Sequence, residues 1–471
     1  MQKRLKTFSY YLFMIIATSC GQLLGDNQTP TVSPVLPGDQ LPFRLSVELE
    51  SFSLPTGLHS FVSATYEGKW LLLAGRTDGL NDFAEPNNFS AASQNRTVYV
   101  IDPEQRTVYS RSLADPASGL TPQQIDSLSV ASAQFYQHKK TLYIAGGYGV
   151  DSATGLFSTK DSLTAINIPR LMRWVATPFP GEKASRYIRQ TFKSIFQITG
   201  GYMNRTKKND TLLMLGQNND SYSEQVRRFD IRDSGRKLSA YVHKSIPKVP
   251  NPDLHRRDLN IVPIIHHVFD LPIPAYLALG GVFTPTGGVW TVPLVIDIDG
   301  KSTMEDPERA ETFKQAMNQY TCPTLQVYSK HRKNMYISLF GGISYGFFKN
   351  NVFETNPQLS FINQLTTISL DRDGKFKQYL MKGEFPSILS TDVNPGNPFL
   401  FGAGAQFIPT TDLPCYRNGV LKLDQMGHKS MLVGYIVGGI RSTSPSTSTP
   451  ADSSASPYIF RVILKGARRP E

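Results

Sequence analysis

Cysteine is scarce in this chain, with 3 residues in 471, and Asp, Glu, Lys and Arg together make up only 18% of it. So little cysteine excludes a small scaffold held together by disulfides. The low charge, combined with 11% aromatic residues, excludes disorder over most of the length. A polytopic membrane protein is excluded too, because no apolar run of about 18 residues follows the first 20 positions.

Glycine and aromatic residues are plentiful instead, with 36 Gly, 27 Phe and 21 Tyr, which disfavours a coiled coil or a helical repeat. The formal net charge of +11 suggests an acidic partner such as nucleic acid or a membrane surface. Three of the basic residues, however, are Lys3, Arg4 and Lys6 at the very start of the chain. The other basic pairs are scattered, so we expect no nucleic-acid partner.

The first twenty residues have the layout of a secretory signal. The three basic residues precede a short apolar stretch, Tyr10 to Ile16, and small residues at 17–19 lead to Cys20. Small residues before a cysteine resemble the lipobox of bacterial lipoproteins. The resemblance implies that Cys20 carries a lipid and anchors the chain at the outer membrane of a bacterial cell envelope, on its periplasmic or surface side. An ordinary signal peptide with an incidental cysteine is the alternative.

This interpretation divides the chain into four parts. Residues 1–19 are expected to be the signal peptide and residues 20–41, rich in Gly, Pro, Asp, Gln and Thr, a flexible tether. Residues 42–465 form the folded part and residues 466–471 a short tail.

The folded part contains a weak internal repeat. Six short apolar runs end in glycine, at residues 70–75, 142–147, 212–216, 276–281, 335–342 and 435–439. Most are preceded by another short strand pattern and followed by two more, so each unit predicts four antiparallel strands. Six such units predict an all-β fold, a six-bladed β-propeller of four-stranded antiparallel blades. In the fourth unit, residues 306–319 predict a helix that begins at Pro307.

A glycine pair after an apolar strand, followed by a long loop, resembles the Kelch repeat, and the resemblance covers residues 43 to 465. The sixth unit ends with a third strand at residues 458–464 and has no fourth strand. Residues 43–50 alternate apolar and polar side chains and have no other partner. We therefore expect this N-terminal segment to close the ring as the outer strand of the last blade.

The loops between the second and third strands are long and share one face of a propeller, where function usually concentrates. They offer aromatic rings beside amides and carboxylates, which suits a sugar or an extended peptide. The alternative is that these side chains only fix the loops to one another. The candidate ligand-binding residues are Asp78, Asn81, Phe83, Asn88, Tyr345, Phe347 and Asn350.

Four glutamines recur in the predicted innermost strands and are candidates for lining the central channel: Gln134, Gln197, Gln326 and Gln406. Their alternative role is to bridge blades by hydrogen bonds, as buried amides commonly do. Cys322 and Cys415 belong to neighbouring blades outside the cytoplasm and could form a disulfide.

The long loops on one face and the expected lipid on Cys20 together suggest a function. We expect a lipid-anchored binding or assembly module for a protein or glycan partner, which touches the membrane only through its lipid and uses no cofactor, metal or catalytic residue. A structural component of an envelope complex, with a flat or apolar flank, is another possibility. The further alternative is a Kelch-type propeller enzyme such as a sugar mutarotase or epimerase. That enzyme needs an acid/base pair at the channel mouth, for instance His59, Arg76 or Asp78 together with a carboxylate.

Overall fold

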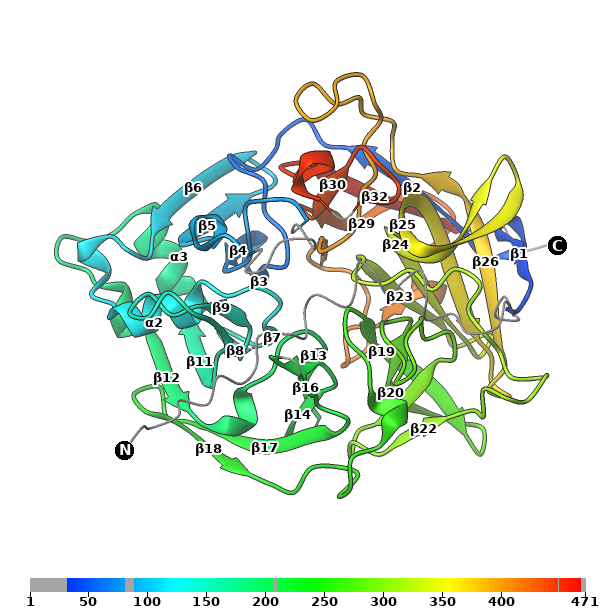
Figure 1. Cartoon of the computed structure of the whole chain (residues 1–471), viewed down its shortest axis with the longest axis horizontal. Helices are drawn as coiled ribbons and strands as arrows, with labels where there is room; N and C mark the ends of the chain where they lie inside the picture. Colours follow the sequence, from blue (N-terminus) through cyan, green and yellow to red (C-terminus); the bar gives the residue numbers. More distant parts are fainter. Residues whose placement is uncertain (1–31, 81–88, 207–209, 220, 448, 467–471) are drawn as a thin grey trace, which may run out of the picture.

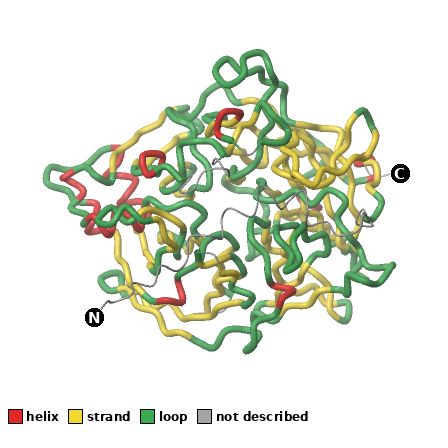
Figure 2. Tube along the Cα trace, in the orientation of Figure 1, coloured by secondary structure: helices red, strands yellow, loops and turns green. Residues whose placement is uncertain are grey.

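The fold is a ring of small antiparallel β-sheets around a common centre (Figure 1). The computed structural model describes residues 32–80, 89–206, 210–219, 221–447 and 449–466. Strands and loops make up most of this part of the chain, and the helices are few and short (Figure 2). The expectation of an all-β protein with a propeller arrangement is confirmed.

Five of the sheets have four strands each, with neighbouring strands antiparallel. The first three are β3–β6 (Val62–Tyr66, Lys69–Leu73, Thr97–Asp102, Thr107–Ser112), then β7, β8, β11 and β12 (Gln134–His138, Thr141–Ala145, Ser162–Asn167, Ile188–Phe192), then β13, β14, β17 and β18 (Tyr202–Arg205, Asp210–Met214, Val226–Asp233, Leu238–Val242). The fourth is β19–β22 (Asn260–Val268, Leu271–Leu279, Leu294–Asp297, Ser302–Met304), and the last contains β27, β29, β32 and β2 (Gln406–Pro409, Ser430–Val437, Ile459–Gly466, Phe43–Leu49). In chain order these are units one to four and unit six.

Unit five is different, because its sheet has six strands in the order β1-β26-β25-β24-β23-β28. Its antiparallel centre is β23 (Thr324–Ser329), β24 (Asn334–Lys349), β25 (Val352–Leu370) and β26 (Phe376–Glu384). Two short strands, β1 (Val35–Pro37) and β28 (Leu421–Lys422), add to its edges in parallel. The prediction of six four-stranded blades is therefore wrong in this respect, since five sheets have that form.

Part of the predicted tether belongs to this sheet. Residues 35–37, expected in the flexible segment, pair as β1 with residues 378–380 of β26. The reason is that Leu36 packs against the apolar cluster beneath the sheet, so the chain is ordered before residue 42. The predicted signal peptide, Cys20 and the first part of the tether lie outside the described residues.

Short elements decorate the ring. Three two-stranded ribbons lie in the loops: β9 with β10 (Tyr148–Val150, Phe157–Thr159), β15 with β16 (Gln217–Asn218, Ser221–Tyr222) and β30 with β31 (Ile440–Ser442, Ser453–Ala455). Among the described residues, two α-helices, α2 (Pro122–Leu128) and α3 (Ile168–Ala176), start after the capping residues Thr121 and Asn167. α3 buries Trp174 in the core between units one and two. No helix of the described part of the chain is long and apolar enough to cross a membrane.

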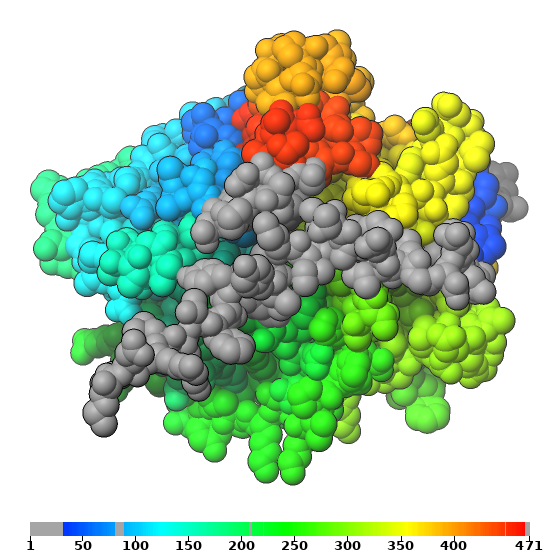
Figure 3. All heavy atoms as spheres, in the orientation of Figure 1, coloured from blue at the N-terminus to red at the C-terminus, as the bar shows by residue number. Residues whose placement is uncertain are grey.

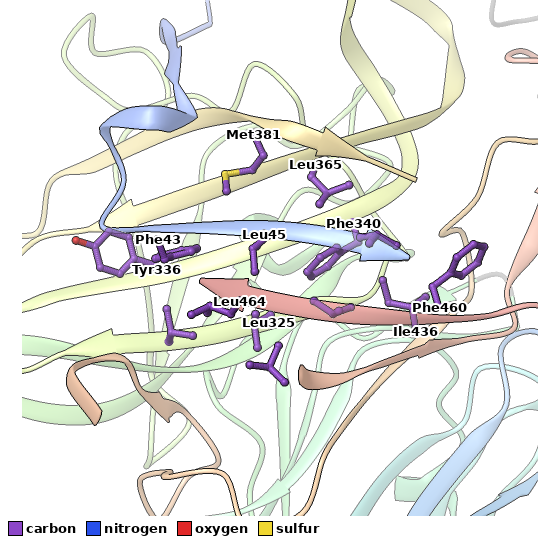
Figure 4. Packing of buried hydrophobic residues seen from close by; sticks show 14 of the residues in the cluster. Phe43, Leu45, Leu325, Tyr336, Phe340, Leu365, Met381, Ile436, Phe460 and Leu464 are labelled. Carbon is purple, nitrogen blue, oxygen red and sulfur yellow. The ribbon is translucent and has the colours of Figure 1, made fainter. Parts of the chain in front are cut away.

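The ring closes as expected, because β2 pairs antiparallel with β32 from Phe43↔Gly466 to Leu49↔Phe460. Phe43 is fully buried and its ring meets that of Tyr336 edge-on, with centroids 5.5 Å apart (Figure 4). β2 thus contributes to the apolar cluster that joins units five and six. The N-terminal strand completes the last sheet and also seals it to its neighbour.

The glycine repeat has one backbone conformation in all six units. The final residue of each motif is a glycine with φ between 84° and 103°: Gly75, Gly147, Gly216, Gly281, Gly342 and Gly439. The residue before each has φ between 58° and 67°, even where it is Ala74 or Leu215. The φ of 84–103° at the final position lies in a region that residues other than glycine avoid, which explains why that position is always glycine.

Five of these glycines link their unit to the next one. In five units the backbone N–H of the final glycine donates to a carbonyl of the following unit, at 2.7–3.3 Å: Gly75 to Val130, Gly147 to Ile198, Gly216 to Arg256, Gly342 to Phe401 and Gly439 to Leu58. The last of these bonds returns to the start of unit one. The motif therefore serves the contacts between sheets as well as the end of each strand.

Two local predictions are wrong. Residues 306–319 form turns and loop rather than a helix, because Gln315 and Gln319 use their side chains on backbone groups of Gly280 and Gly341. In unit three the innermost strand is β13, after Gly201, and not residues 195–197. The early glycine pair in that unit shifts the strand toward the C-terminus.

Candidate functional site

The loops that begin at the glycine motifs share one face of the ring, called the loop face below. In unit one, this face holds a cluster of three residues: His59 and Arg76, which are buried, and Asp78, whose side chain is 25% exposed. His59 precedes β3, Arg76 follows β4, and the two residues form an antiparallel bridge. Arg76 Nε donates to Asp78 Oδ1 at 2.9 Å, Nη2 bonds Oδ2, and His59 Nε2 lies 3.6 Å from Oδ1.

The charges of this cluster suit it to holding the first loop in place rather than to transferring a proton. Burial on its own raises the pKa of the Asp78 carboxyl, but the hydrogen bonds and charges of His59 and Arg76 outweigh it and lower the pKa to about 2. Burial lowers the pKa of His59, against the opposing effect of Asp78. At neutral pH Asp78 is thus an ionised partner of Arg76, and it fixes the start of the first loop.

The other predicted loop-face residues are separated. Asn81, Phe83 and Asn88 lie outside the described residues. Tyr345, Phe347 and Asn350 do not lie on a loop, because residues 344–364 belong to the long hairpin of β24 and β25. Asn350 occupies its tip, where positive φ at both turn residues is typical of a two-residue hairpin. The hairpin, in yellow, stands at the edge of the face in Figures 1 and 3.

Some loop contacts agree with the alternative that loops fix one another. The Leu80 N–H donates to Ser453 Oγ at 2.8 Å, which ties unit one to the segment of β31, seen as red against blue in Figure 3. Leu80 also packs near Phe361 of the β24–β25 hairpin. The first loop therefore holds units one, five and six together.

The glutamines divide between the two proposed roles. Gln134 is buried and donates to the carbonyls of Gly200 and Leu215 at 2.7 and 2.9 Å, and Gln406 bonds the Phe61 carbonyl and Ser63. Both residues bridge neighbouring units, as the alternative predicted.

The remaining two glutamines form no such bridge in the described contacts. Gln326 bonds Thr324 of its own strand at 2.7 Å. Gln197 follows a 3-10 helix, Ser194–Phe196, and is not on a strand. Its predicted place in an innermost strand is wrong because the strand of unit three begins at Tyr202.

Cys322 and Cys415 are both free thiols. The backbone of Cys415 forms a β-bridge with Leu421, and Leu421 in turn pairs with Val327, so Cys415 lies level with Val327. Cys322 lies five residues before Val327 along the same segment. At about 3.3 Å per extended residue, that separation is about 16 Å, well over the ~7 Å that a disulfide spans between Cα atoms. Burial raises the pKa of the Cys322 thiol to about 12. The possible disulfide is therefore not formed.

A second charged cluster lies on the loop face where unit three meets unit four. Glu224 follows β16, and His255 follows a 3-10 helix, Pro252–Leu254. His255 Nδ1 and Glu224 Oε1 are 2.6 Å apart, and each side chain is about a quarter exposed, at 23% and 27%. The Tyr222 ring stacks on the imidazole, with centroids 3.6 Å apart and planes at 20°.

Arg257 extends this cluster, which we call the Tyr222 platform: Tyr222, Glu224, His255 and Arg257. The guanidinium lies 5.8 Å from the Tyr222 ring, and its Nη1 donates to Gln217 Oε1 at 3.1 Å. Asp258 Oδ2 is 3.5 Å from its Nε. A guanidinium has five N–H donors, so these contacts leave capacity for an anionic ligand.

Buried groups hold the platform from behind. Trp290 Nε1 donates to the His255 carbonyl at 2.7 Å. Arg256 is fully buried, lies 4.1 Å over the Trp290 ring and donates to the Val292 carbonyl at 3.0 Å. Burial lowers the pKa of Arg256 to about 9. His255 and Arg257 are thus displayed from a rigid support.

Chemically, the platform can bind and can transfer a proton. A carboxylate on Nδ1 fixes the imidazole so that Nε2 is the free ring nitrogen, which is the arrangement of a general acid or base. Sequence reasoning missed it because Tyr222 and Glu224 belong to unit three and His255 and Arg257 to unit four. Arg256–Arg257 was visible only as one of several basic pairs, and no spacing rule links it to Glu224.

The sheets and their arrangement define an all-β protein of the propeller type. No family model matches the chain, and no curated protein matches it. Among solved structures, one titled "Structure of YjhT" is similar, with a TM-score of 0.45 and 12% identity. The match covers 88% of this chain and 99% of that one. A likeness of this size carries no argument about function.

Proposed function

We propose that this chain is a lipid-anchored extracytoplasmic binding module of the bacterial cell envelope that presents its loop face to a protein or glycan partner. In this proposal the ring is Kelch-like. The observation that carries the proposal is the Tyr222 platform, in which a partly exposed aromatic stack lies beside a guanidinium.

Of the two partners, the platform favours a glycan with a carboxylate group. Sugar rings pack on aromatic faces, and the Tyr222–His255 stack supplies one. Arg257 suits a carboxylate, since its planar fork binds that group in a bidentate manner. In the His59–Asp78–Arg76 cluster, by contrast, His59 and Arg76 are buried and the Asp78 carboxylate is already paired with Arg76, so we assign this cluster the role of supporting the loop face.

The second candidate function is the Kelch-type enzyme, a sugar mutarotase or epimerase. One specific observation favours it, the 2.6 Å contact between His255 and Glu224 beside Arg257. In such a reaction His255 Nε2 would take or give the proton, Glu224 would orient the ring, and Arg257 would hold the sugar carboxylate.

Titration of the purified chain with a uronic-acid trisaccharide and with its neutral hexose counterpart tests both functions. We expect the acidic sugar to bind more tightly, Tyr222→Ala and Arg257→Gln to weaken binding about 10-fold or more, and the control Tyr241→Ala to have no effect. Tyr241 is 53% exposed on β18, in the same unit but off the platform. Equal binding by Tyr222→Ala and wild type would contradict the proposal. Faster anomer interconversion by wild type, abolished in Glu224→Gln, would favour the enzyme.

The anchor has its own test. Wild type is expected in the membrane fraction, and Cys20→Ser in the soluble fraction, because a lipid on Cys20 would be the attachment. A Cys415→Ser variant controls for loss of a thiol. Identical fractionation of wild type and Cys20→Ser would refute lipid anchoring at this residue.

A further inference from the structure

Away from the loop face, unit three carries a compact cluster of two aspartates and a histidine. Asp210, the first residue of β14, is the register partner of Asp230 in β17. His243 directly follows β18, and its Nε2 lies 3.2 Å from Asp230 Oδ1. One ligand atom from each of the three residues lies within 4.8 Å of the others.

One carboxylate oxygen in this cluster is left without a partner. Asp210 is only 9% exposed, and its Oδ2 accepts a hydrogen bond of 2.6 Å from Arg228 Nη2. Its Oδ1 is buried and has no hydrogen-bond partner among the described residues. Buried carboxylate oxygens are normally hydrogen-bonded or bound to a cation, so this atom indicates a missing ligand.

The charges in this cluster also favour a bound cation. Two carboxylates directly opposite each other on neighbouring strands repel. Arg228 is the cation that contacts this pair among the described residues, through its hydrogen bond to Asp210 Oδ2. Among the described residues, one guanidinium beside the two facing carboxylates leaves an excess of one negative charge, which a divalent cation would neutralise.

We propose that Asp210, Asp230 and His243 form a binding site for a divalent transition metal, with Zn²⁺ as the ion these ligands suit. An imidazole with two carboxylates is a borderline donor set that fits Zn²⁺ better than Mg²⁺ or Ca²⁺, which prefer oxygen ligands alone. Three protein ligands leave a fourth position for water. Arg228 stays on Oδ2 of Asp210 and orients that carboxylate from the outer shell.

The bound ion would join β14, β17 and the end of β18, so its role is to stabilise unit three. This site departs from the expectation that the chain binds no metal. The sequence did not reveal it because the three ligands come from three strand regions and follow no recognised metal-binding spacing. Only the register of β14 against β17 brings the two carboxylates together.

Calorimetric titration of the metal-depleted full chain with Zn²⁺ tests the site. The chain carries Cys20→Ser and Cys415→Ser, so that no accessible thiol competes for the ion. We expect one Zn²⁺ per chain, a higher melting temperature with Zn²⁺ than with Mg²⁺, and at least 10-fold weaker binding in Asp230→Asn and His243→Gln. Asp412→Asn and His331→Gln, at exposed positions, serve as matched controls and are expected to bind as the parent does.

Folding of the variants is checked by circular dichroism. His243→Gln is the critical variant, because its side chain is already 33% exposed and its loss should leave the sheet intact. Failure of the parent chain to bind Zn²⁺, or unchanged binding in His243→Gln, would overturn the site and would show that His243 and Asp230 form an ordinary ion pair. The outcome is independent of the glycan experiment, since the metal cluster shares no residue with the Tyr222 platform.

Discussion

Phe43→Ala is expected to lower the free energy of unfolding by about 4 kcal/mol, the middle of the range for removing a buried phenylalanine. Phe43 is 0% exposed in β2, and its edge-on contact with Tyr336 adds to the loss. We expect the cavity to stay open, because the strands on both sides of it belong to different units (Figure 4). The cost should therefore appear in full.

Urea unfolding followed by circular dichroism measures this effect. Phe269→Ala is the matched control, since Phe269 is 98% exposed at the turn between β19 and β20 and its loss should change stability by less than about 0.5 kcal/mol. A loss below about 1 kcal/mol for Phe43→Ala would mean that the N-terminal strand does not stabilise the ring.

Gly147→Ala is the second substitution with a large expected effect, a loss of about 3 kcal/mol. Gly147 has a φ of 90°, and a methyl group there would lie 2.5 Å from Val130 Cγ2 and 3.0 Å from Ala133 Cβ. Backbone strain accounts for about 1–2 kcal/mol and overpacking for a similar amount. The N–H of the same residue donates to the Ile198 carbonyl, so any shift also weakens the link to unit three.

Gly396→Ala separates the two contributions. Gly396 has the same φ of 90°, but no heavy atom lies within 4 Å of a Cβ built there. Its replacement should incur the strain alone, about 1–2 kcal/mol. Equal losses in the two variants, measured by urea unfolding, would show that the contact between units tolerates a methyl group and that the motif needs glycine only for its φ.

The repeat was predictable because it is local. An apolar run whose last residue has a positive φ ends in glycine, which is visible in the sequence, and all six of these glycines adopt the same backbone conformation. Two of the motifs have a single glycine, because Ala74 and Leu215 adopt the first positive φ in place of a glycine. Each motif alone is therefore a weak signal. The closing strand was predictable for a different reason, since the last unit lacked a strand and residues 43–50 had no other partner.

The contacts that the sequence could not reveal are those between different units of the ring. The positions of Gln134 and Gln406 in the sequence suggest that they line the channel. In the structure, each side-chain amide instead donates a hydrogen bond to a backbone carbonyl of the neighbouring unit. His255 and Glu224 come from two units and meet only after the sheets pack. The helix expected at 306–319 failed because its pattern of polar residues serves backbone groups of units four and five. Local propensity carries no information about such contacts.

The pairing of β2 with β32 also sets an order of events in time. Phe43 must pair with Gly466, about 420 positions later, so the ring cannot close until residue 466 has been made. Contacts so distant in sequence make folding slow. If the chain crosses a membrane as it is synthesised, it emerges with an unpaired N-terminal strand, and the last strand to arrive completes the ring. Until then the exposed edges of β2 and β29 are open to other strands, so a chaperone that covers them would benefit this protein in particular.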